Sequence, residues 1–154
     1  MIQLDGTAQA TYDLMMKTVV GPRLRTLGFK GSSGRYERPD DTDFVLIGFQ
    51  KSAYSDRSHI RFTVNLSTIS RAAWATHKTA KDDRLARPQA NTNYGWWARQ
   101  CRLADAMGEE EDQWWDLSTP EHIDPVASQV LAAIETHGLA WLAEGSAGHN
   151  ARAD

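Results

Sequence analysis

The sequence has only one cysteine, Cys101, so an intramolecular disulfide is excluded. No apolar run approaches the roughly 20 residues that a membrane-spanning helix needs, and residues 1–10 lack the basic start and apolar stretch of a signal peptide. We therefore expect a cytoplasmic protein without a membrane segment. At 154 residues, with 41% hydrophobic and 24% charged side chains, the chain can form one domain without disulfides or a structural metal.

Several functional motifs are also missing. The chain has no glycine-rich phosphate-binding loop and no histidine–cysteine spacing typical of zinc sites. The acidic run at 109–112 lacks the spaced ligands and the turn glycine of a calcium loop. We therefore predict no metal site and no cofactor.

Basic residues are almost absent from the last third of the chain. Residues 103–154 hold 1 basic and 11 acidic side chains, whereas residues 51–102 hold 10 basic and 3 acidic ones. The basic middle would attract an anionic ligand, but the two segments can also face each other or solvent within one fold. A net charge of −3, a pI near 5.9 and the lack of a recognisable module disfavour nucleic-acid binding.

Two runs, 44–52 and 59–68, have the pattern of adjacent antiparallel strands. Within 60–66 apolar and polar residues alternate, which predicts one buried face and one polar face. Residues 44–49 are apolar on both faces, which indicates a more central strand, and Gly48 stands where a bulkier side chain is expected. The polar segment 53–58 between the runs predicts a hairpin connection.

Helices are predicted near both ends of the chain. Segment 7–27 carries an apolar stripe, and Gly21-Pro22 is expected to kink or divide it. A last helix is expected to start with Asp124 as N-cap and Pro125 in the first helical position, and to end at Gly138. The remaining predicted elements are a strand at 35–38, a helix at 71–81, a strand at 96–103, and a short strand or turn at 113–117.

Together these elements predict an α+β fold, a single-domain antiparallel β-sheet with helices packed on one face. The domain is expected to span 1–144. The small and polar residues 145–154 are expected to form a disordered tail.

A set of short motifs resembles the bacterial family called domain of unknown function 4304. The motifs are Leu27-Gly28-Phe29-Lys30, Tyr36-Glu37-Arg38, Ile47-Gly48-Phe49-Gln50-Lys51-Ser52, Phe62-Thr63-Val64-Asn65-Leu66, Arg102-Leu103 with Asp112-Gln113-Trp114-Trp115, and the closing Gly138-Leu139. The resemblance covers roughly residues 10–145, nearly all of the periodic elements. It implies the same α+β fold and brings no reaction, ligand or catalytic residue.

Polar residues on or beside the two central strands form the first candidate ligand site. They are Gln50, Lys51, His59, Arg61 and Asn65. If the polar faces meet, this patch suits a carboxylate or phosphate, with Arg61 making a forked contact. The alternative is a solvated sheet face with ordinary cross-strand pairs. His59 is also a candidate general base, but only Asp56 in the same turn is in place to orient it.

Six tryptophans are the most unusual feature of the composition. In the pairs Trp96-Trp97 and Trp114-Trp115, one indole of each pair would face inward on a strand and one outward. We take Trp97 and Trp115 as candidates for a ligand-stacking wall or partner surface. Alternatively, the indoles cover the far face of the sheet. Cys101 is predicted to be a buried structural cysteine rather than a reactive thiol.

The leading hypothesis is a non-enzymatic binding or protein-interaction domain. It would use the polar sheet face and exposed tryptophans to hold a protein partner or a small anionic ligand. The alternative is a small hydrolase- or transferase-like enzyme acting on an anionic small molecule at the same face, with His59, Arg61 and Asn65 in acid–base and anion-holding roles. A titratable group in a concave pocket would favour the enzyme, and an exposed flat apolar patch would favour the interaction domain.

Overall fold

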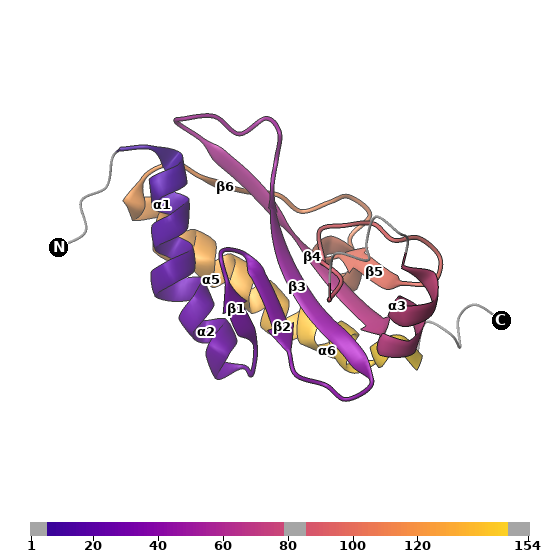
Figure 1. Ribbon diagram of the computed structural model, residues 1–154. Coiled ribbons are helices and arrows are strands. Elements are labelled where there is room, and N and C mark those ends of the chain that lie inside the picture. The colour runs from indigo at the N-terminus through magenta and orange to yellow at the C-terminus, as the bar shows by residue number, and fades with distance from the viewer. Residues whose placement is uncertain (1–5, 79–85, 148–154) are drawn as a thin grey trace.

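The computed structural model describes residues 6–78 and 86–147. Within these residues the chain forms one antiparallel sheet of six strands in the order β1-β2-β3-β4-β5, and β6 pairs with β4 on the same edge as β5. The strands are β1 (Lys30–Ser32), β2 (Arg35–Arg38), β3 (Asp43–Lys51), β4 (Ile60–Ser70), β5 (Arg99–Arg102) and β6 (Trp115–Leu117). The two longest strands, β3 and β4, run side by side through the middle of the molecule (Figure 1).

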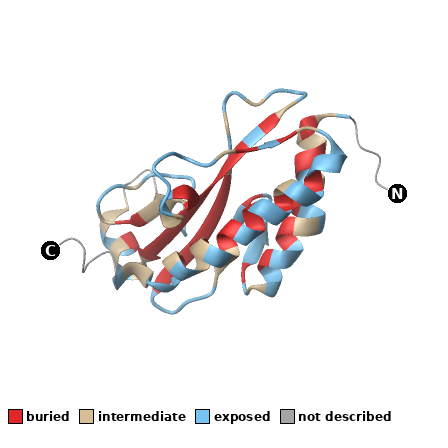
Figure 2. Ribbon diagram, turned by 180° about the vertical axis from the view of Figure 1, so that it is seen from behind, coloured by how far each residue is buried: buried red, intermediate tan, exposed pale blue. Residues whose placement is uncertain are grey.

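Most of the helices cover one face of this sheet. In order along the chain, the helical elements are α1 (Ala8–Met15), η1 (Met16–Val20), α2 (Gly21–Thr26), α3 (Arg71–His77), α4 (Leu103–Ala106), η3 (Pro120–His122), α5 (Ile123–Ala133), η4 (Ile134–Gly138) and α6 (Leu139–Ala143). The N-terminal helical run, from α1 to α2, and the C-terminal run, from α5 to α6, lie across the same side of β3 and β4 (Figure 2). The predicted α+β fold with an antiparallel sheet is therefore confirmed, and both long helical runs pack on one face.

The alternation of β4 decides which side chains meet the helices. Phe62, Val64 and Leu66 are fully buried in the main core, which they share with residues of α1 and α5. Thr63, Asn65 and Ser67 are also buried, but they point to the opposite face. There, helix α3 and the segment 86–98 cover part of the sheet, with Phe44, Ile69 and Trp74 in a second, smaller core. We call the two sides the helix face and the amide face.

The N-terminal helical run accommodates Pro22 by a π-helical turn that immediately precedes α2. The Thr7 side chain caps α1 by accepting a hydrogen bond from the Ala10 backbone N–H at 3.1 Å. Because Pro22 has no N–H to donate, a regular helix would lose a bond there. The turn η1 precedes it, and the Gly21 N–H bonds to the Met16 carbonyl five residues back. The break expected at Gly21-Pro22 thus takes the form of a π turn.

The C-terminal helical run differs from its predicted bounds. Helix α5 begins at Ile123, after the 3₁₀ turn η3, so Asp124 lies in its first turn and the N-cap prediction is wrong. The predicted end at Gly138 is also wrong, because η4 leads directly into α6. A Cβ atom at position 138 would lie 3.3 Å from Leu103 Cδ1. The glycine therefore serves the close approach of this helix to α4.

Gly48 allows the segment above the amide face to lie directly on β3. A Cβ atom at this position would lie 2.3 Å from Asn91 Oδ1 and 2.9 Å from Ala90 Cβ. Both distances are shorter than van der Waals contact, so any larger side chain would push the segment away. The absence of a bulkier residue in this otherwise apolar strand is thereby explained.

The described chain ends beyond the predicted domain boundary. Residues 145–147 are helical, and the Ser146 backbone N–H donates to Asp43 Oδ2 at 2.9 Å. These three residues therefore pack on the sheet, whereas the rest of the predicted tail, 148–154, lies outside the described residues. The end of the helix predicted at 71–81 also lies outside them, since α3 is described to His77. No helix within the described ranges is long and apolar enough to cross a membrane.

Candidate functional site

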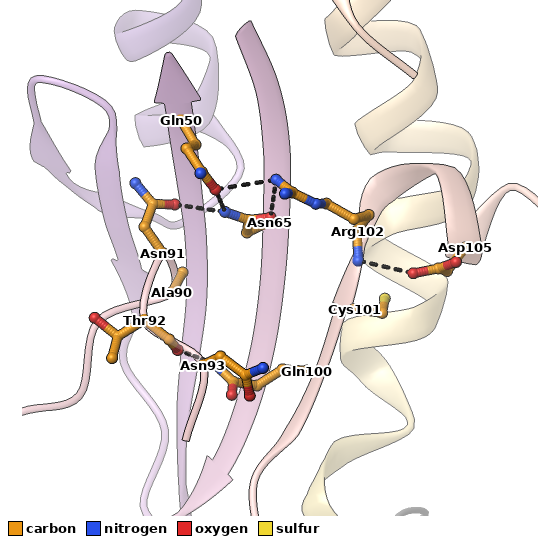
Figure 3. A pocket seen from close by; sticks show the side chains of 10 residues that line it. All are labelled: Gln50, Asn65, Ala90, Asn91, Thr92, Asn93, Gln100, Cys101, Arg102 and Asp105. Atoms are coloured by element: carbon orange, nitrogen blue, oxygen red, sulfur yellow. Dashed lines mark hydrogen bonds between the residues drawn. The ribbon is translucent and has the colours of Figure 1, made fainter. Parts of the chain in front are cut away.

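A cavity of about 310 Å³ opens on the amide face, between the sheet and the segment that lies over Gly48. It is bounded by three strands, β3, β4 and β5, and by that segment (Figure 3). We call it the amide pocket, and its polar side chains include Gln50, Asn65, Asn91, Asn93, Gln100 and Arg102. Cross-strand pairing brings Asn65 opposite both Gly48 and Arg102, so the residues at its centre come from adjacent strands.

Arg102 fixes the orientation of the amides around it. Its Nη1 donates to Gln50 Oε1 at 3.0 Å and to Asn65 Oδ1 at 2.9 Å. A guanidinium can only donate, so both amides must turn their oxygens toward it. The Asn65 Nδ2 group is then left to donate, and it does so to Gln50 Oε1 and to Asn91 Oδ1, each at 2.8 Å. Asn91 completes the chain by donating to the Phe49 carbonyl at 3.0 Å.

Gln100 holds the other wall of the pocket in the same way. Its Nε2 donates to Ser67 Oγ at 3.1 Å and to the Thr92 carbonyl at 2.8 Å, and its Oε1 accepts from the Tyr94 N–H at 3.0 Å. The segment above the sheet is therefore tied down by side chains on both β4 and β5. Side chains held by several directional hydrogen bonds in this way specify one geometry.

One carboxylate and an indole lie beside the Arg102 side chain, and a second carboxylate binds its backbone. Asp112 Oδ2 lies 3.5 Å from Arg102 Nε, and the Arg102 backbone N–H donates to Asp105 Oδ2 at 3.0 Å. The guanidinium carbon is 5.5 Å from the centre of the Trp114 ring, and that of Arg61 is 5.8 Å from the same ring. Trp114 thus connects the amide pocket to the neighbouring surface at Arg61.

The sequence of this fold matches one known protein family. The family model described as a domain of unknown function (DUF4304) matches residues 20–144, which include all six strands. The chain belongs to the DUF4304 family. The comparisons with curated proteins and with solved structures found no match.

The DUF4304 fold brings two of the predicted ligand-binding residues together and separates others. Gln50 and Asn65 both line the amide pocket and share a hydrogen bond. Arg61 lies on the same face but four residues away along β4, about 13 Å from Asn65 at the usual strand rise. His59 lies farther still, beyond the start of β4. The single predicted patch is therefore divided, with His59 and Arg61 apart from Gln50 and Asn65.

His59 has a partner that sequence reasoning missed. Its Nε2 lies 2.8 Å from Asp116 Oδ1, and Ser118 Oγ lies 3.5 Å from its Nδ1. Asp116 is on β6, directly opposite Arg61. Asp56, the carboxylate expected to orient the imidazole, instead accepts hydrogen bonds from the backbone N–H and hydroxyl of Ser58. Those bonds, and above all the one from the Ser58 hydroxyl, lower the pKa of the Asp56 carboxyl.

Lys51 points away from the amide face, contrary to the predicted patch. Neighbouring residues of a strand face opposite sides, so Lys51 and Gln50 cannot share a surface. Lys51 pairs with Phe62 across the strands, and its Nζ donates to Gln9 Oε1 at 2.8 Å on the helix face. Its ammonium also lies 5.5 Å from the centre of the Tyr12 ring.

The tryptophans chosen as exposed are the wrong members of their pairs. Trp115 is only 5% exposed and stacks on Phe62 at 6.0 Å, because it pairs with that core residue across β6 and β4. Trp97 is half-buried against Trp74 and His77, whereas its neighbour Trp96 is 77% exposed. Neither Trp97 nor Trp115 lines the amide pocket.

Sequence reasoning also missed most of the pocket. Gln100 and Arg102 flank Cys101 on β5, so alternation alone indicates that these two side chains share a polar face. Asn91 lies in an irregular segment, where no periodicity reports which side chain meets the sheet. Cys101 is half-buried and packs against the main core. Among the described residues, no group of three or more His, Cys, Asp and Glu side chains has the arrangement of a metal site.

Proposed function

We propose that this DUF4304 domain is a non-enzymatic binding domain whose amide pocket holds a small ligand through the ligand's oxygen atoms. One observation carries the proposal: every side-chain amide oxygen of the pocket already accepts a hydrogen bond. Gln50, Asn65 and Asn91 accept within the network, and the oxygens of Asn93 and Gln100 accept from the backbone N–H groups of Gly95 and Tyr94.

The groups left for a ligand are donors. Within the part of the chain that the structure describes, no hydrogen bond uses Gln50 Nε2, Asn93 Nδ2 or Arg102 Nη2. Three such donors around one cavity match a carboxylate or a pair of carbonyl oxygens. The cavity volume of about 310 Å³ lies at the small end of the range for small-molecule sites.

Charge contributes less than hydrogen bonding to this recognition. Asp112 lies beside the Arg102 guanidinium and offsets its positive charge. The pocket therefore favours a ligand with well-placed oxygen acceptors over one with a high negative charge. Among anionic ligands, a monocarboxylate fits this balance better than a phosphate.

A thermal-shift and calorimetric screen of small carboxylates and amides against the whole chain tests the proposal. For a compound that binds, Asn93→Ala removes one free donor at an exposed position and is expected to weaken binding by roughly 3- to 10-fold. Arg61→Gln serves as the control, since Arg61 contacts the same Trp114 ring outside the pocket. Absence of any binding compound, or equal loss of affinity in both variants, would contradict the proposal.

A hydrolase-like enzyme is the second candidate, favoured by the arrangement of Asp116, His59 and Ser118. In a nucleophilic enzyme, a carboxylate orients the histidine and the histidine activates a hydroxyl. The His59 and Asp116 side chains are 42% and 55% exposed, however, which gives an open surface rather than a water-excluding site. Hydrolysis of p-nitrophenyl acetate that Ser118→Ala abolishes and Ser58→Ala leaves unchanged would support the enzyme over the binding domain.

A further inference from the structure

A second cavity, of about 470 Å³, lies on the helix side of the molecule. It is bounded by the π turn η1, by α2, by the β1–β2 hairpin and by the end of β3. We call it the tyrosine pocket, because both Tyr12 and Tyr36 line it. Both it and the amide pocket involve β3, but they use side chains that point to opposite faces of the strand.

The inner wall of the tyrosine pocket is aromatic. Tyr12, Tyr36 and Phe49 are all buried, and the rings of Tyr36 and Phe49 meet edge to face at 6.2 Å. Two glycines leave room for the phenol groups. A Cβ atom at Gly34 would lie 3.6 Å from the Tyr12 hydroxyl, and one at Gly21 would lie 3.4 Å from the Tyr36 hydroxyl. Such a wall suits a planar or apolar ligand body.

The Tyr12 hydroxyl is a polar group of this wall that is open to the cavity. The side chain is only 5% exposed and no hydrogen bond of its hydroxyl is found among the described residues, but the oxygen is not one of the buried unpaired polar atoms, so water reaches it. A ligand oxygen that replaced this water would accept a hydrogen bond from the phenol. Burial raises the pKa of Tyr12 far above its usual value, with smaller effects from Tyr36 and Asp13, and burial also raises that of Tyr36. Both phenols therefore stay protonated near neutral pH and can donate.

Positive charge is concentrated at the mouth of the pocket. Lys17, Arg25 and Lys51 are exposed there, with Asp13 as the one acidic side chain of the lining. Gln9 lies between two of these charges, since it donates to Asp13 and accepts from Lys51, each at 2.8 Å. Arg25 lies at the inner edge, where its Nη1 and the Tyr36 hydroxyl are each 3.4 Å from the same point above Gly21. The surplus of two positive charges suits a dianion.

The backbone around this pocket departs from regular geometry at two places. The helix contains the π turn η1, which supplies Lys17, and Ser33 in the hairpin has a φ of +54°. Single π turns inside helices are frequent at functional sites. A non-glycine residue in the left-handed region is also uncommon and is often found at ligand-binding positions.

We propose that the tyrosine pocket binds a small phosphomonoester with an aromatic or apolar body. The phosphate would be held by Arg25, Lys17 and the Tyr12 hydroxyl, and the body would lie on the aromatic wall. A phosphate dianion matches the charge surplus, and its oxygens accept from both guanidinium and phenol donors. This site is independent of the amide pocket, and neither proposal depends on the other.

Titration calorimetry with phenyl phosphate tests the site in the whole chain. We expect saturable binding, and we expect Arg25→Gln to weaken it roughly 10- to 100-fold, as for loss of a hydrogen bond to a charged group. Arg35→Gln is the matched control. It removes the same charge from the hairpin that borders the pocket, but Arg35 is exposed on the opposite face of β2 and lines no part of this pocket. Its expected effect is less than about twofold.

Three further results decide the proposal. Tyr12→Phe keeps the ring and removes the hydroxyl, and it should weaken phenyl phosphate binding by about 5- to 10-fold. Inorganic phosphate should bind at least about tenfold more weakly than phenyl phosphate, and benzoate should too, since each lacks half of the recognised chemistry. No binding at millimolar phenyl phosphate, equal losses in Arg25→Gln and Arg35→Gln, or equal affinity for inorganic phosphate would each overturn it. If Tyr12→Phe does not fold, the exposed Arg25 still decides the outcome.

Discussion

The two faces of the central sheet are both buried, but by different chemistry. On the helix face of β4, Phe62, Val64 and Leu66 pack against helices without any polar contact. On the amide face of the same strand, Thr63 and Asn65 are buried under neighbouring segments, and their side chains form hydrogen bonds to those segments. One strand therefore contributes to an apolar core and to a polar network through alternate residues.

The difference shows how each face of the sheet fixes its side chains. Apolar burial is non-directional, so the helix face gains its stability from area and shape. Hydrogen bonds are directional. On the amide face the Arg102 guanidinium can only donate, so it sets the orientation of each amide in turn. A surface whose donors are held in place before a ligand arrives loses less entropy on binding. The amide face therefore presents hydrogen-bond donors in fixed positions, and the helix face contributes most of the stability.

The strongest test of this division is the removal of a large side chain from the helix face. Phe62 is fully buried and contacts the rings of Tyr12, Phe49 and Trp115. We expect Phe62→Ala to lower the free energy of unfolding by about 3–5 kcal/mol, measured by urea denaturation. Phe62→Leu, which leaves a smaller cavity, should cost clearly less. Equal losses in the two variants would show that ring volume does not govern this face.

A methyl group added at Gly48 should destabilise the fold, because the segment above the amide face lies directly on this residue. Gly48→Ala places a Cβ atom where Asn91 and Ala90 already lie, and it should cost about 1–3 kcal/mol through overpacking. Denaturation of the variant measures this cost. Combining it with Asn91→Ala removes the nearer of the two clashes, so the double variant should lose less stability than the sum of the single ones. Strict additivity would indicate that the segment does not rest on Gly48.

Loss of a central amide should cost less than loss of a core ring. Asn65→Ala leaves Arg102 and Asn91 each without one partner, and we expect a loss of about 1–2 kcal/mol in urea denaturation. The control is Asn93→Ala, which removes an exposed amide outside this network and should stay within about 0.5 kcal/mol. If the two variants lose the same stability, hydrogen bonding does not hold the amide face together.

The alternation of apolar and polar residues made the sheet and its helix face predictable from the sequence. The pattern of 60–66 determines which β4 residues meet the helices, and the composition of 44–49 places β3 in the centre. The helix ends were less predictable. Asp124 and Gly138 have the residue types of helix ends, but tertiary packing on α4 and the preceding 3₁₀ turn determine where the helix runs.

The amide pocket was only half predictable, for a physical reason. Gln50 and Asn65 lie on periodic strands, so their shared face follows from the sequence. Asn91 reaches the pocket because its segment crosses the sheet at Gly48, and no local pattern encodes a crossing between segments more than 40 residues apart. The same limit applies to His59 and Asp116, which only the pairing of β6 with β4 brings together.

The smallest expected effect concerns a buried tyrosine on the helix face. Because burial raises the pKa of Tyr12, the folded state keeps this proton at a pH where the unfolded chain loses it. The unfolded state then binds fewer protons, so the free energy of unfolding should fall as the pH rises above about 10, by up to about 1.4 kcal/mol per pH unit for one such group. Denaturation between pH 8 and 11 measures the slope. Tyr12→Phe should reduce it, and Tyr54→Phe should not, because Tyr54 is 89% exposed. Equal slopes in both variants would mean that water stabilises the ionised Tyr12 hydroxyl in the folded state. The water-excluding part of the helix face would then not extend to the tyrosine pocket.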